Sequence, residues 1–259
     1  MEKPFRDIAA GTRLIETMLW QPGRGVVLAR RHKDRMCLSA KAMGFPFDAR
    51  AFDDIVNSPL ETLQAAHEEP RAPHEHLQVT HEALGAEHEA LHASPQPARA
   101  GPEETPLCLR ITLDSSGRFD HTMAPAPEPA SGWRIAIAPE RLQSADPWLK
   151  VKSSNRALYD RTRAGLPQGI DEAVFLNEKG HLCEGTITNL MIETTPGQWI
   201  TPPLSDGVLP GVMRAELLAT GAIKVASFTA ADLRAARRIR LCNALRGVIE
   251  VTGVTAWPD

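Results

Sequence analysis

The most informative segment of this chain is Asn177-Glu178-Lys179-Gly180-His181-Leu182-Cys183-Glu184-Gly185-Thr186-Ile187-Thr188-Asn189-Leu190. Short apolar runs lie in and around it and are joined by turns that contain Gly or Asn, at 173–176, 181–184, 188–193 and 199–201. Strands of this length between such turns predict an antiparallel meander. Glu184 ends one of these strands and faces a glycine turn. Its carboxylate is therefore placed to contact a ligand. The alternative is that Glu184 is an ordinary surface glutamate at the end of a strand.

The segments that flank the meander add strands and helices to the second half of the chain. A strand is predicted at 133–138 and a helix at about 154–164. The apolar segment 212–220 predicts a helix that ends at Gly221, and strands follow at 240–243 and 248–251. Because strands and helices mix without a strict β-α-β alternation, the predicted fold class is α+β.

The first half predicts a smaller unit of two hairpins and two helices. The hairpins pair 13–19 with 26–28 and 107–113 with 119–123, across turns that contain glycine. The helices are expected at 29–43, where Gly44 is a stop signal, and at 48–66. The Pro-rich stretch 124–132 suits neither helix nor sheet. We therefore predict two domains, 1–124 and 133–259, joined by a linker at 125–132.

Composition and charge exclude several classes of protein. The net charge of the 259 residues is −3, which gives no electrostatic footprint for nucleic acid or for an anionic membrane. No apolar run approaches the ~20 residues that a membrane span needs, and the charged N-terminus lacks the core of a signal peptide. The four cysteines are scattered, which suits reduced thiols better than disulfides or a zinc site. The sequence predicts a cytoplasmic protein without a metal.

A histidine-rich segment at about 67–105 fits neither predicted domain. A four-residue pattern of His, Glu, any residue and Leu recurs with a period of seven, and it begins at His74, His81 and His88. This period places the histidines and leucines on one helical stripe, but one leucine per heptad is a thin seam for a coiled coil. His88 and His92 are four residues apart and could share a metal. A surface insertion that forms a short helix or stays disordered is the simpler interpretation.

Three further segments offer chemically useful groups. Lys152 is expected at the start of a helix; if desolvated it loses its proton readily and becomes a nucleophile or base, and otherwise it is a solvated surface lysine. Pro210-Gly211 opens the helix at 212 and leaves backbone N–H groups free at its positive end, which suits a phosphate. Arg35, in His32-Lys33-Asp34-Arg35-Met36, offers a guanidinium for a phosphate.

Together with Leu241-Cys242-Asn243-Ala244-Leu245-Arg246-Gly247-Val248, these segments resemble in order and spacing the class IV aminotransferases, the fold-type IV pyridoxal-phosphate enzymes. The resemblance covers nearly the whole chain except about 67–105. It implies a two-domain α+β fold like that of D-amino-acid aminotransferase, with pyridoxal 5′-phosphate as cofactor and a small-molecule amino substrate. Relatives in this family usually complete each active site near a subunit interface, so we expect a homodimer with no nucleic-acid or membrane partner.

The resemblance also implies a role for each matching residue. Lys152 would carry the cofactor as a Schiff base and, once freed, would move the substrate proton, which makes it the catalytic residue. Glu184 would pair with the pyridine nitrogen. The remaining expected cofactor contacts are Arg35 at the phosphate, the backbone N–H groups of Val212 and Met213 at the phosphate, Asn243 and Ala244 in the loop that borders phosphate and substrate, and Arg156, which stands where some relatives have a tyrosine.

Two activities fit this frame, and Lys152 and Glu184 would serve both. Aminodeoxychorismate lyases tend to have Asn and then a small residue after the last-but-one strand, as Asn243-Ala244 does, whereas aminotransferases of the family tend to have Gly-Thr or Ser-Thr. The sequence therefore favours 4-amino-4-deoxychorismate lyase, which forms 4-aminobenzoate and pyruvate for folate synthesis. An aminotransferase for a branched-chain or D-amino acid is the alternative. A third interpretation is a non-catalytic member of the family that merely binds the cofactor, or that binds a partner through the histidine-rich segment.

Overall fold

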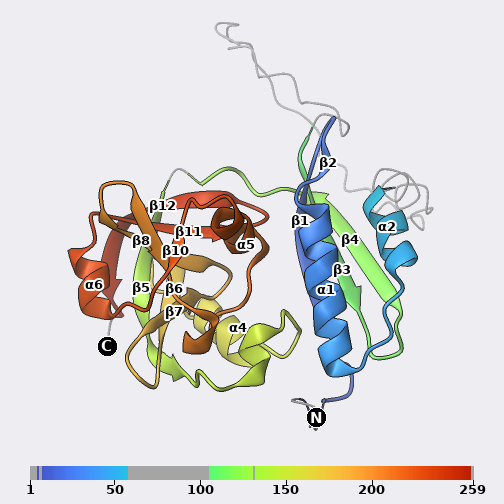
Figure 1. Cartoon of the computed structure of the whole chain (residues 1–259), viewed down its shortest axis with the longest axis horizontal. Coiled ribbons are helices and arrows are strands. Elements are labelled where there is room, and N and C mark those ends of the chain that lie inside the picture. The colour runs from blue at the N-terminus through green and yellow to red at the C-terminus, as the bar shows by residue number, and fades with distance from the viewer. Residues whose placement is uncertain (1–4, 6–7, 58–104, 131, 258–259) are drawn as a thin grey trace, which may run out of the picture.

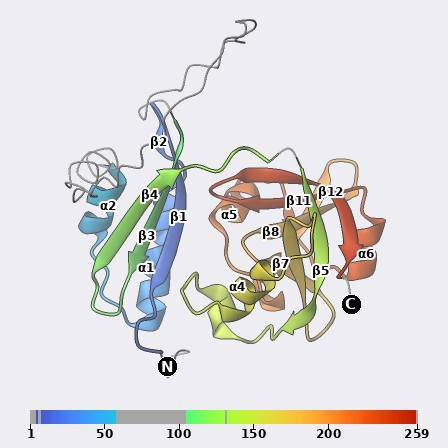
Figure 2. The ribbon, with the colours of Figure 1, turned by 180° about the vertical axis from the view of Figure 1, so that it is seen from behind.

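The computed structural model of the chain describes residue 5 and residues 8–57, 105–130 and 132–257. Its strands form two sheets that lie side by side, each with its own helices (Figure 1; Figure 2). The mixture of helices and strands confirms the predicted α+β class. The histidine-rich heptads lie outside the described residues.

The N-terminal part is an antiparallel sheet with two helices. Its described strands, in the order β2-β1-β3-β4, are β1 (Leu14–Gln21), β2 (Gly25–Val26), β3 (Leu107–Leu113) and β4 (Phe119–Pro125). The helices are α1 (Ala29–Met43) and α2 (Ala49–Asn57). The second predicted hairpin and the helix over 29–43 are confirmed. The first hairpin is present, but its returning strand is only Gly25–Val26 and pairs with Trp20 and Gln21 rather than with 13–19. The helix predicted at 48–66 begins as expected, and its part beyond Asn57 lies outside the described residues.

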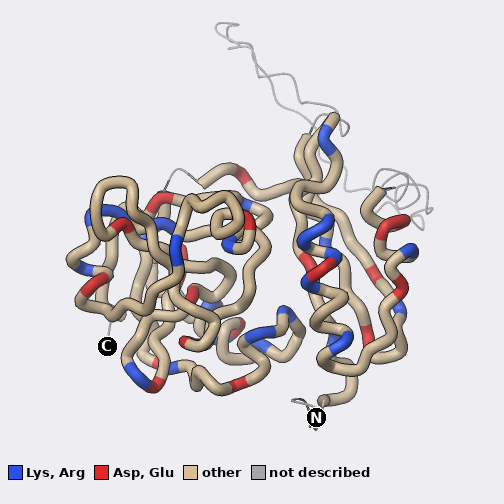
Figure 3. The backbone as a smooth tube through the Cα atoms, in the orientation of Figure 1, with Lys and Arg blue, Asp and Glu red and all other residues tan. Residues whose placement is uncertain are grey.

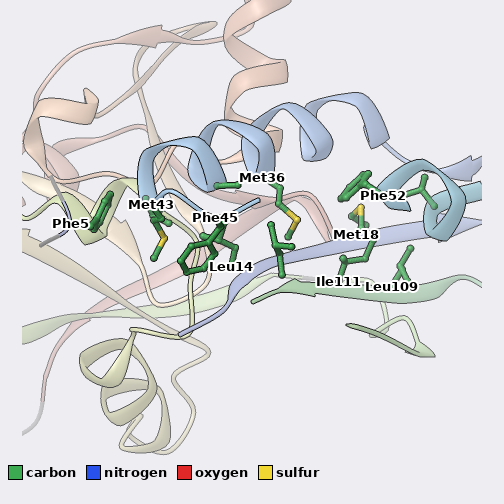
Figure 4. Close-up of a cluster of buried hydrophobic side chains, with 13 residues drawn as sticks. Phe5, Leu14, Met18, Met36, Met43, Phe45, Phe52, Leu109 and Ile111 are labelled. Atoms are coloured by element: carbon green, nitrogen blue, oxygen red, sulfur yellow. The ribbon is translucent and has the colours of Figure 1, made fainter. Parts of the chain in front are cut away.

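Alternating side chains on β1 separate a core face from a face that looks toward the second sheet. Leu14 and Met18 of β1 are buried with Ile111 of β3 in the cluster that lies under helix α1 (Figure 4). Successive side chains of a strand point to opposite faces. Ile15 and Thr17 therefore lie on the other face, where they are available to a site between the two sheets.

The C-terminal part is a mixed sheet that closes on itself. In the described chain its strands, ordered β10-β9-β8-β11-β12-β5-β6-β7, are β5 (Trp133–Leu142), β6 (Glu172–Asn177), β7 (Leu182–Gly185), β8 (Asn189–Thr195), β9 (Gln198–Thr201), β10 (Lys224–Val225), β11 (Arg238–Asn243) and β12 (Gly247–Ala256). A further pairing of Glu184 with Asn189 joins β7 to β8 and closes the ring. The predicted meander from β6 to β9 is confirmed as antiparallel.

The segment around Lys152 differs from the prediction. β5 pairs in parallel with β6, and a parallel pair needs a crossover connection, which residues 143–171 supply. This crossover holds a 3₁₀ helix (Pro147–Lys150) and α4 (Ala157–Ala164). The prediction that Lys152 starts a helix is therefore wrong. The reason is that neighbouring Ser153 forms a β-bridge with Leu14 of β1, which keeps this stretch extended.

The remaining helices complete the C-terminal part. The predicted helix after Gly211 is confirmed as α5 (Val212–Ala219). A 3₁₀ turn (Leu204–Asp206) and α6 (Ala230–Ala235) were not predicted. Helix α6 is only six residues long, and a capping box between Thr229 and Asp232 fixes its start. So short a segment carries too little apolar periodicity to be recognised in sequence.

Charged residues of both signs are interspersed over both parts of the chain (Figure 3). This distribution agrees with the small net charge of −3. Among the described residues, no helix is long and apolar enough to cross a membrane. The segment expected to be the linker, 125–132, leads from β4 of the first sheet to β5 of the second. That it marks the domain boundary stays a proposal.

Candidate active site

A cavity of about 520 Å³ lies between the two sheets. Strand β1 and helix α1 contribute one side, and the Lys152 segment, the β7–β8 turn, the start of α5 and the β11–β12 turn contribute the other. The cavity brings together all but one of the residues predicted from sequence: Arg35, Lys152, Arg156, Glu184, Val212, Asn243 and Ala244. Met213 is the exception, because its side chain packs near Met191 and Trp199. Any contact of Met213 with a ligand would therefore use its backbone.

Lys152 is the one lysine that lines this cavity within the described part of the chain. Backbone pairing fixes its segment, since Ile15 N–H donates to the Lys152 carbonyl at 2.9 Å. Burial lowers the pKa of the Lys152 amine to about 8, and the positive charges of Arg35 and Arg156 add to this effect. An amine with such a pKa is partly unprotonated near neutral pH and is able to act as a nucleophile.

Glu184 is buried, with only 5% of its surface exposed, so its interpretation as a surface glutamate is wrong. Its carboxylate accepts hydrogen bonds from Leu209 N–H at 2.8 Å, from the Tyr159 hydroxyl at 2.8 Å and from the Asn189 amide at 3.4 Å. Burial raises the pKa of Glu184 to about 7, and the first two hydrogen bonds and the charge of Lys152 limit the rise.

Arg35 reaches the cavity from α1 and is held by a carboxylate that the sequence analysis did not single out. Its Nε and Nη2 donate to the two carboxylate oxygens of Glu16 at 2.8 and 2.5 Å, and His32 Nδ1 lies 2.5 Å from the same carboxylate. Burial alone would raise the pKa of Glu16, but Arg35 and His32 lower it to about 2, so Glu16 is ionised. Two of the five guanidinium N–H groups bind Glu16 and a third points to Pro210, which leaves two for a ligand.

Helix α5 opens onto the cavity beside Arg35. Its N-cap is Gly211, and no side chain caps its first N–H groups, which lie at the positive end of the helix dipole. Gly211 is required here, because a Cβ would lie 1.8 Å from Asn189 Oδ1. Arg35 Nη1 lies 3.4 Å from the carbonyl of Pro210, so the guanidinium and the helix start are side by side. Together they form a corner that favours an anion.

Arg156 and Asn243 line the cavity, and each also makes hydrogen bonds within the protein. Arg156 donates to Asp160 at 2.7 Å and to the carbonyl of Thr186 at 3.0 Å. Asn243 Oδ1 accepts from two backbone N–H groups of its own turn, at 3.1 and 2.8 Å. Both residues therefore shape the walls of the cavity, and the small, buried Ala244 leaves room beside them.

A second buried glutamate, also not singled out from sequence, organises the turn that follows Glu184. Glu172 of β6 has no exposed surface. Its carboxylate accepts from the N–H groups of Thr186 and Ile187 at 3.0 and 3.1 Å and from the hydroxyl of Thr188 at 3.0 Å. The Thr186 hydroxyl donates to it as well. Glu172 thereby fixes the part of the cavity wall next to Glu184.

The family model for amino-transferase class IV matches residues 13–254. The chain belongs to the class IV aminotransferase family. The match includes both sheets and every residue predicted for the site, and it confirms the resemblance noted in the sequence. Membership establishes a fold-type IV, pyridoxal-phosphate-dependent enzyme.

Proteins named as aminodeoxychorismate lyases and proteins named as aminotransferases are both similar to this chain. The aminodeoxychorismate lyase of Saccharomyces cerevisiae is 29% identical over 143 residues, which are 48% of this chain and 38% of the yeast protein. The chain thus spans less than half the length of this curated relative. A solved structure assigned as an amino-acid aminotransferase from Mesorhizobium loti is 31% identical, with a TM-score of 0.71 over 95% of this chain and 100% of its own. A hypothetical aminotransferase from Mycobacterium tuberculosis, solved with α-ketoglutarate and PMP, is 18% identical, with a TM-score of 0.70 over 98% and 87% of the two chains.

The residues of the cavity fit pyridoxal 5′-phosphate, the cofactor of the family. Its aldehyde requires an amine with a lowered pKa, which Lys152 offers. Its pyridine nitrogen requires an acidic partner, and Glu184 is a buried carboxylate with one oxygen not yet saturated. Its phosphate suits the corner made by Arg35 and the start of α5. We propose these residues as the cofactor site.

The lowered pKa of Lys152 predicts how fast the cofactor-free enzyme captures pyridoxal phosphate at different pH values. The free amine is the nucleophile, so the capture rate should rise through a midpoint near pH 8. An ordinary lysine has a pKa of 10.5, about 2.5 units higher, so Lys152 should react roughly a few hundred times faster near neutral pH. Stopped-flow absorbance from pH 6 to about pH 10 measures this rate. A midpoint at the pKa of an ordinary lysine would contradict the burial of the amine.

Proposed function

We propose that this enzyme is a 4-amino-4-deoxychorismate lyase, which converts its substrate to 4-aminobenzoate and pyruvate. The observation that carries the proposal is a pair of arginines on the wall of the cavity, Arg110 from β3 and Arg246 from the β11–β12 turn. Burial raises the pKa of the Cys108 thiol, and the charges of both arginines oppose that rise. The two guanidinium groups therefore approach the same region from opposite walls.

Neither arginine has an acidic partner among the residues that the structure describes. Arg246 donates to the backbone carbonyl of Glu128 at 3.3 Å and lies over the ring of Trp133 at 5.3 Å, so its charge is not neutralised. The lyase substrate carries two carboxylates, which suit two guanidinium groups, whereas the apolar side chain of a branched-chain amino acid does not. The name of the yeast relative and the Asn243-Ala244 turn support the same choice.

The residues of the cavity divide the work of this reaction. Lys152 would hold the cofactor through its amine and, as a free amine, would take the proton from the amine-bearing carbon of the substrate. Pyridoxal phosphate, when bound, supplies an electron sink for the charge that develops there. Glu184 keeps the ring nitrogen protonated, and Arg35 with the start of α5 holds the phosphate. The C–O bond between the ring and the enolpyruvyl group would break, the leaving enolate would take up a proton to become pyruvate, and the ring that remains would be the aromatic product.

An aminotransferase for a branched-chain or D-amino acid is the second candidate. The observation that favours it is the 31% identity with the Mesorhizobium loti protein, which extends over 95% of this chain. Lys152, Glu184 and the phosphate corner would serve that reaction equally well. The homodimer and the cytoplasmic location stay predictions from the sequence.

Product analysis separates the two candidates. The holoenzyme should release 4-aminobenzoate and pyruvate in equal amounts from aminodeoxychorismate, and it should transfer little amino group from leucine or D-alanine to 2-oxoglutarate. Arg246→Gln should raise KM for aminodeoxychorismate roughly tenfold or more, because a hydrogen bond between charged groups is lost. Arg234→Gln on the exposed surface of α6 is the matched control. Rapid transamination without 4-aminobenzoate would refute the proposal.

A further inference from the structure

Tyr159, the single tyrosine of the chain, lies in the first turn of α4 and on the wall of the cavity. Its ring packs edge-on against Phe175 of β6, with the centroids 5.2 Å apart, and the guanidinium of Arg156 lies 5.6 Å from its centroid. These contacts hold the ring in place. Its hydroxyl donates to Glu184 Oε1 at 2.8 Å. None of the family motifs noted in the sequence includes this tyrosine.

The Tyr159 hydroxyl decides which oxygen of Glu184 is left for a ligand. Glu184 Oε2 accepts from Leu209 N–H at 2.8 Å and from Asn189 Nδ2 at 3.4 Å. A carboxylate oxygen offers about two acceptor positions, so Oε2 is saturated. Within the described residues Oε1 accepts from Tyr159 alone and keeps one position. A donor that enters from the cavity therefore meets Oε1.

Glu184 is buried, so its carboxylate depends on hydrogen-bond donors to stay ionised. Burial favours its neutral form and raises its pKa to about 7, while hydrogen bonds from Leu209 and Tyr159 act in the opposite direction. Ionisable groups face Glu184 from three parts of the chain: the crossover with Lys152, Arg156 and, in α4, Tyr159; β7 with Cys183; and α5 with Arg214. Of these groups, only Tyr159 donates a hydrogen bond to the carboxylate in the described structure.

We propose that Tyr159 is a positioning residue that keeps Glu184 in its carboxylate form and turned so that Oε1 is offered to the ring nitrogen of the cofactor. The proposal rests on the cofactor role assigned to Glu184, and it is independent of whether the substrate is aminodeoxychorismate or an amino acid. A phenol suits this task because it stays protonated. Burial and the neighbouring charge of Glu184 both raise the pKa of Tyr159.

A single tyrosine makes this contact directly observable. In cofactor-free protein labelled with carbon-13 at the tyrosine Cζ, the one resonance belongs to Tyr159. Its chemical shift should follow the ionisation of Glu184, with a midpoint near pH 7. The titration should vanish in Glu184→Gln and persist in Asp160→Asn, which removes the exposed carboxylate next to Tyr159 in sequence. A signal that is flat from about pH 5 to pH 9, or one that also titrates in Glu184→Gln, would overturn the proposal.

Tyr159→Phe tests the consequence for the cofactor, because it keeps the ring against Phe175 and removes only the hydroxyl. The acid limb of the pH–turnover profile should move up by about one pH unit, and the cofactor Kd near neutral pH should rise severalfold. In a double variant, Tyr159→Phe added to Glu184→Gln should weaken cofactor binding no further than Glu184→Gln alone, since Tyr159 acts through Glu184. The positioning role of Tyr159 would be refuted if the pH–turnover profile and the cofactor Kd were both unchanged. It would also be refuted if Tyr159→Phe weakened cofactor binding equally in the wild type and in Glu184→Gln. Because Kd and the carbon-13 titration need no substrate, a failed lyase assay would leave this test intact.

Discussion

Lys152→Ala should lower the turnover of the holoenzyme by at least about a thousandfold, the largest loss that we expect from a single substitution. Lys152 is proposed both to attach the cofactor and to move the substrate proton. In the described part of the chain no other lysine lines the cavity and could replace it. Pyridoxal phosphate should still bind without a covalent bond, because Arg35 and the start of α5 remain. Steady-state turnover and the cofactor content of the purified variant measure both effects.

The matched control for this substitution is Lys150→Ala. Lys150 is exposed, lies two residues before Lys152 and does not line the cavity, so turnover should change by less than about twofold. Borohydride should attach the cofactor irreversibly to the peptide that contains Lys152 in the wild type and in Lys150→Ala. Attachment at Lys150, or full turnover of Lys152→Ala, would show that Lys152 has been assigned the wrong role.

Glu184→Gln should lower turnover roughly ten- to a hundredfold. A hydrogen bond to a charged group contributes about 1.5–3 kcal/mol, and its loss in the transition state alone slows the reaction by that factor. Glutamine keeps the size of the side chain, but it cannot hold the ring nitrogen in its protonated form. Cofactor affinity should fall less than turnover, because the phosphate contacts remain. Unchanged turnover with the cofactor fully bound would rule out the electron-sink role, and Glu128→Gln, at an exposed residue, is the control.

The stability of the cofactor-free protein gives an independent measure of Glu184. Its pKa in the folded state is about 7, above the ordinary value of 4.5, so the folded protein binds this proton more tightly than the unfolded chain does. The contribution of Glu184 to stability is therefore fully present below about pH 4.5 and is lost as the pH rises toward 7. Glu184→Gln should remove this part of the pH dependence in urea unfolding. An identical pH dependence in wild type and variant would contradict the burial of the charge.

Local patterns were sufficient to predict most elements of the fold. The short apolar runs, the glycine turns between strands and the stop signal at Gly44 each act over a few residues, and the structure contains the elements that they predict. The parallel pairing of β5 with β6 could not be predicted in this way. It joins strands that the whole crossover separates, and no local pattern records which strands become neighbours.

The partners of the site residues were harder to predict than the residues themselves. Glu16 carried a signal, because it occupies a core-facing position between Leu14 and Met18, where an unpaired charge would be costly. Glu172 is likewise a charged residue at the start of a strand whose residues are all buried. Tyr159 carried no such signal. Its importance comes from one hydrogen bond to Glu184, which lies 25 positions away in the chain.

The sequence by itself determined the family, the α+β class and the residues with reactive groups, because motifs and periodicity are written in short stretches of chain. Only the tertiary structure decided the electrostatic state of those groups. The pKa of Lys152 near 8 and that of Glu184 near 7 follow from burial between two sheets and from charges that folding brings close. The same holds for the phosphate corner, where Arg35 meets Pro210 from 175 positions away. Desolvation and Coulomb interactions depend on distance in space, and a linear sequence does not contain that distance.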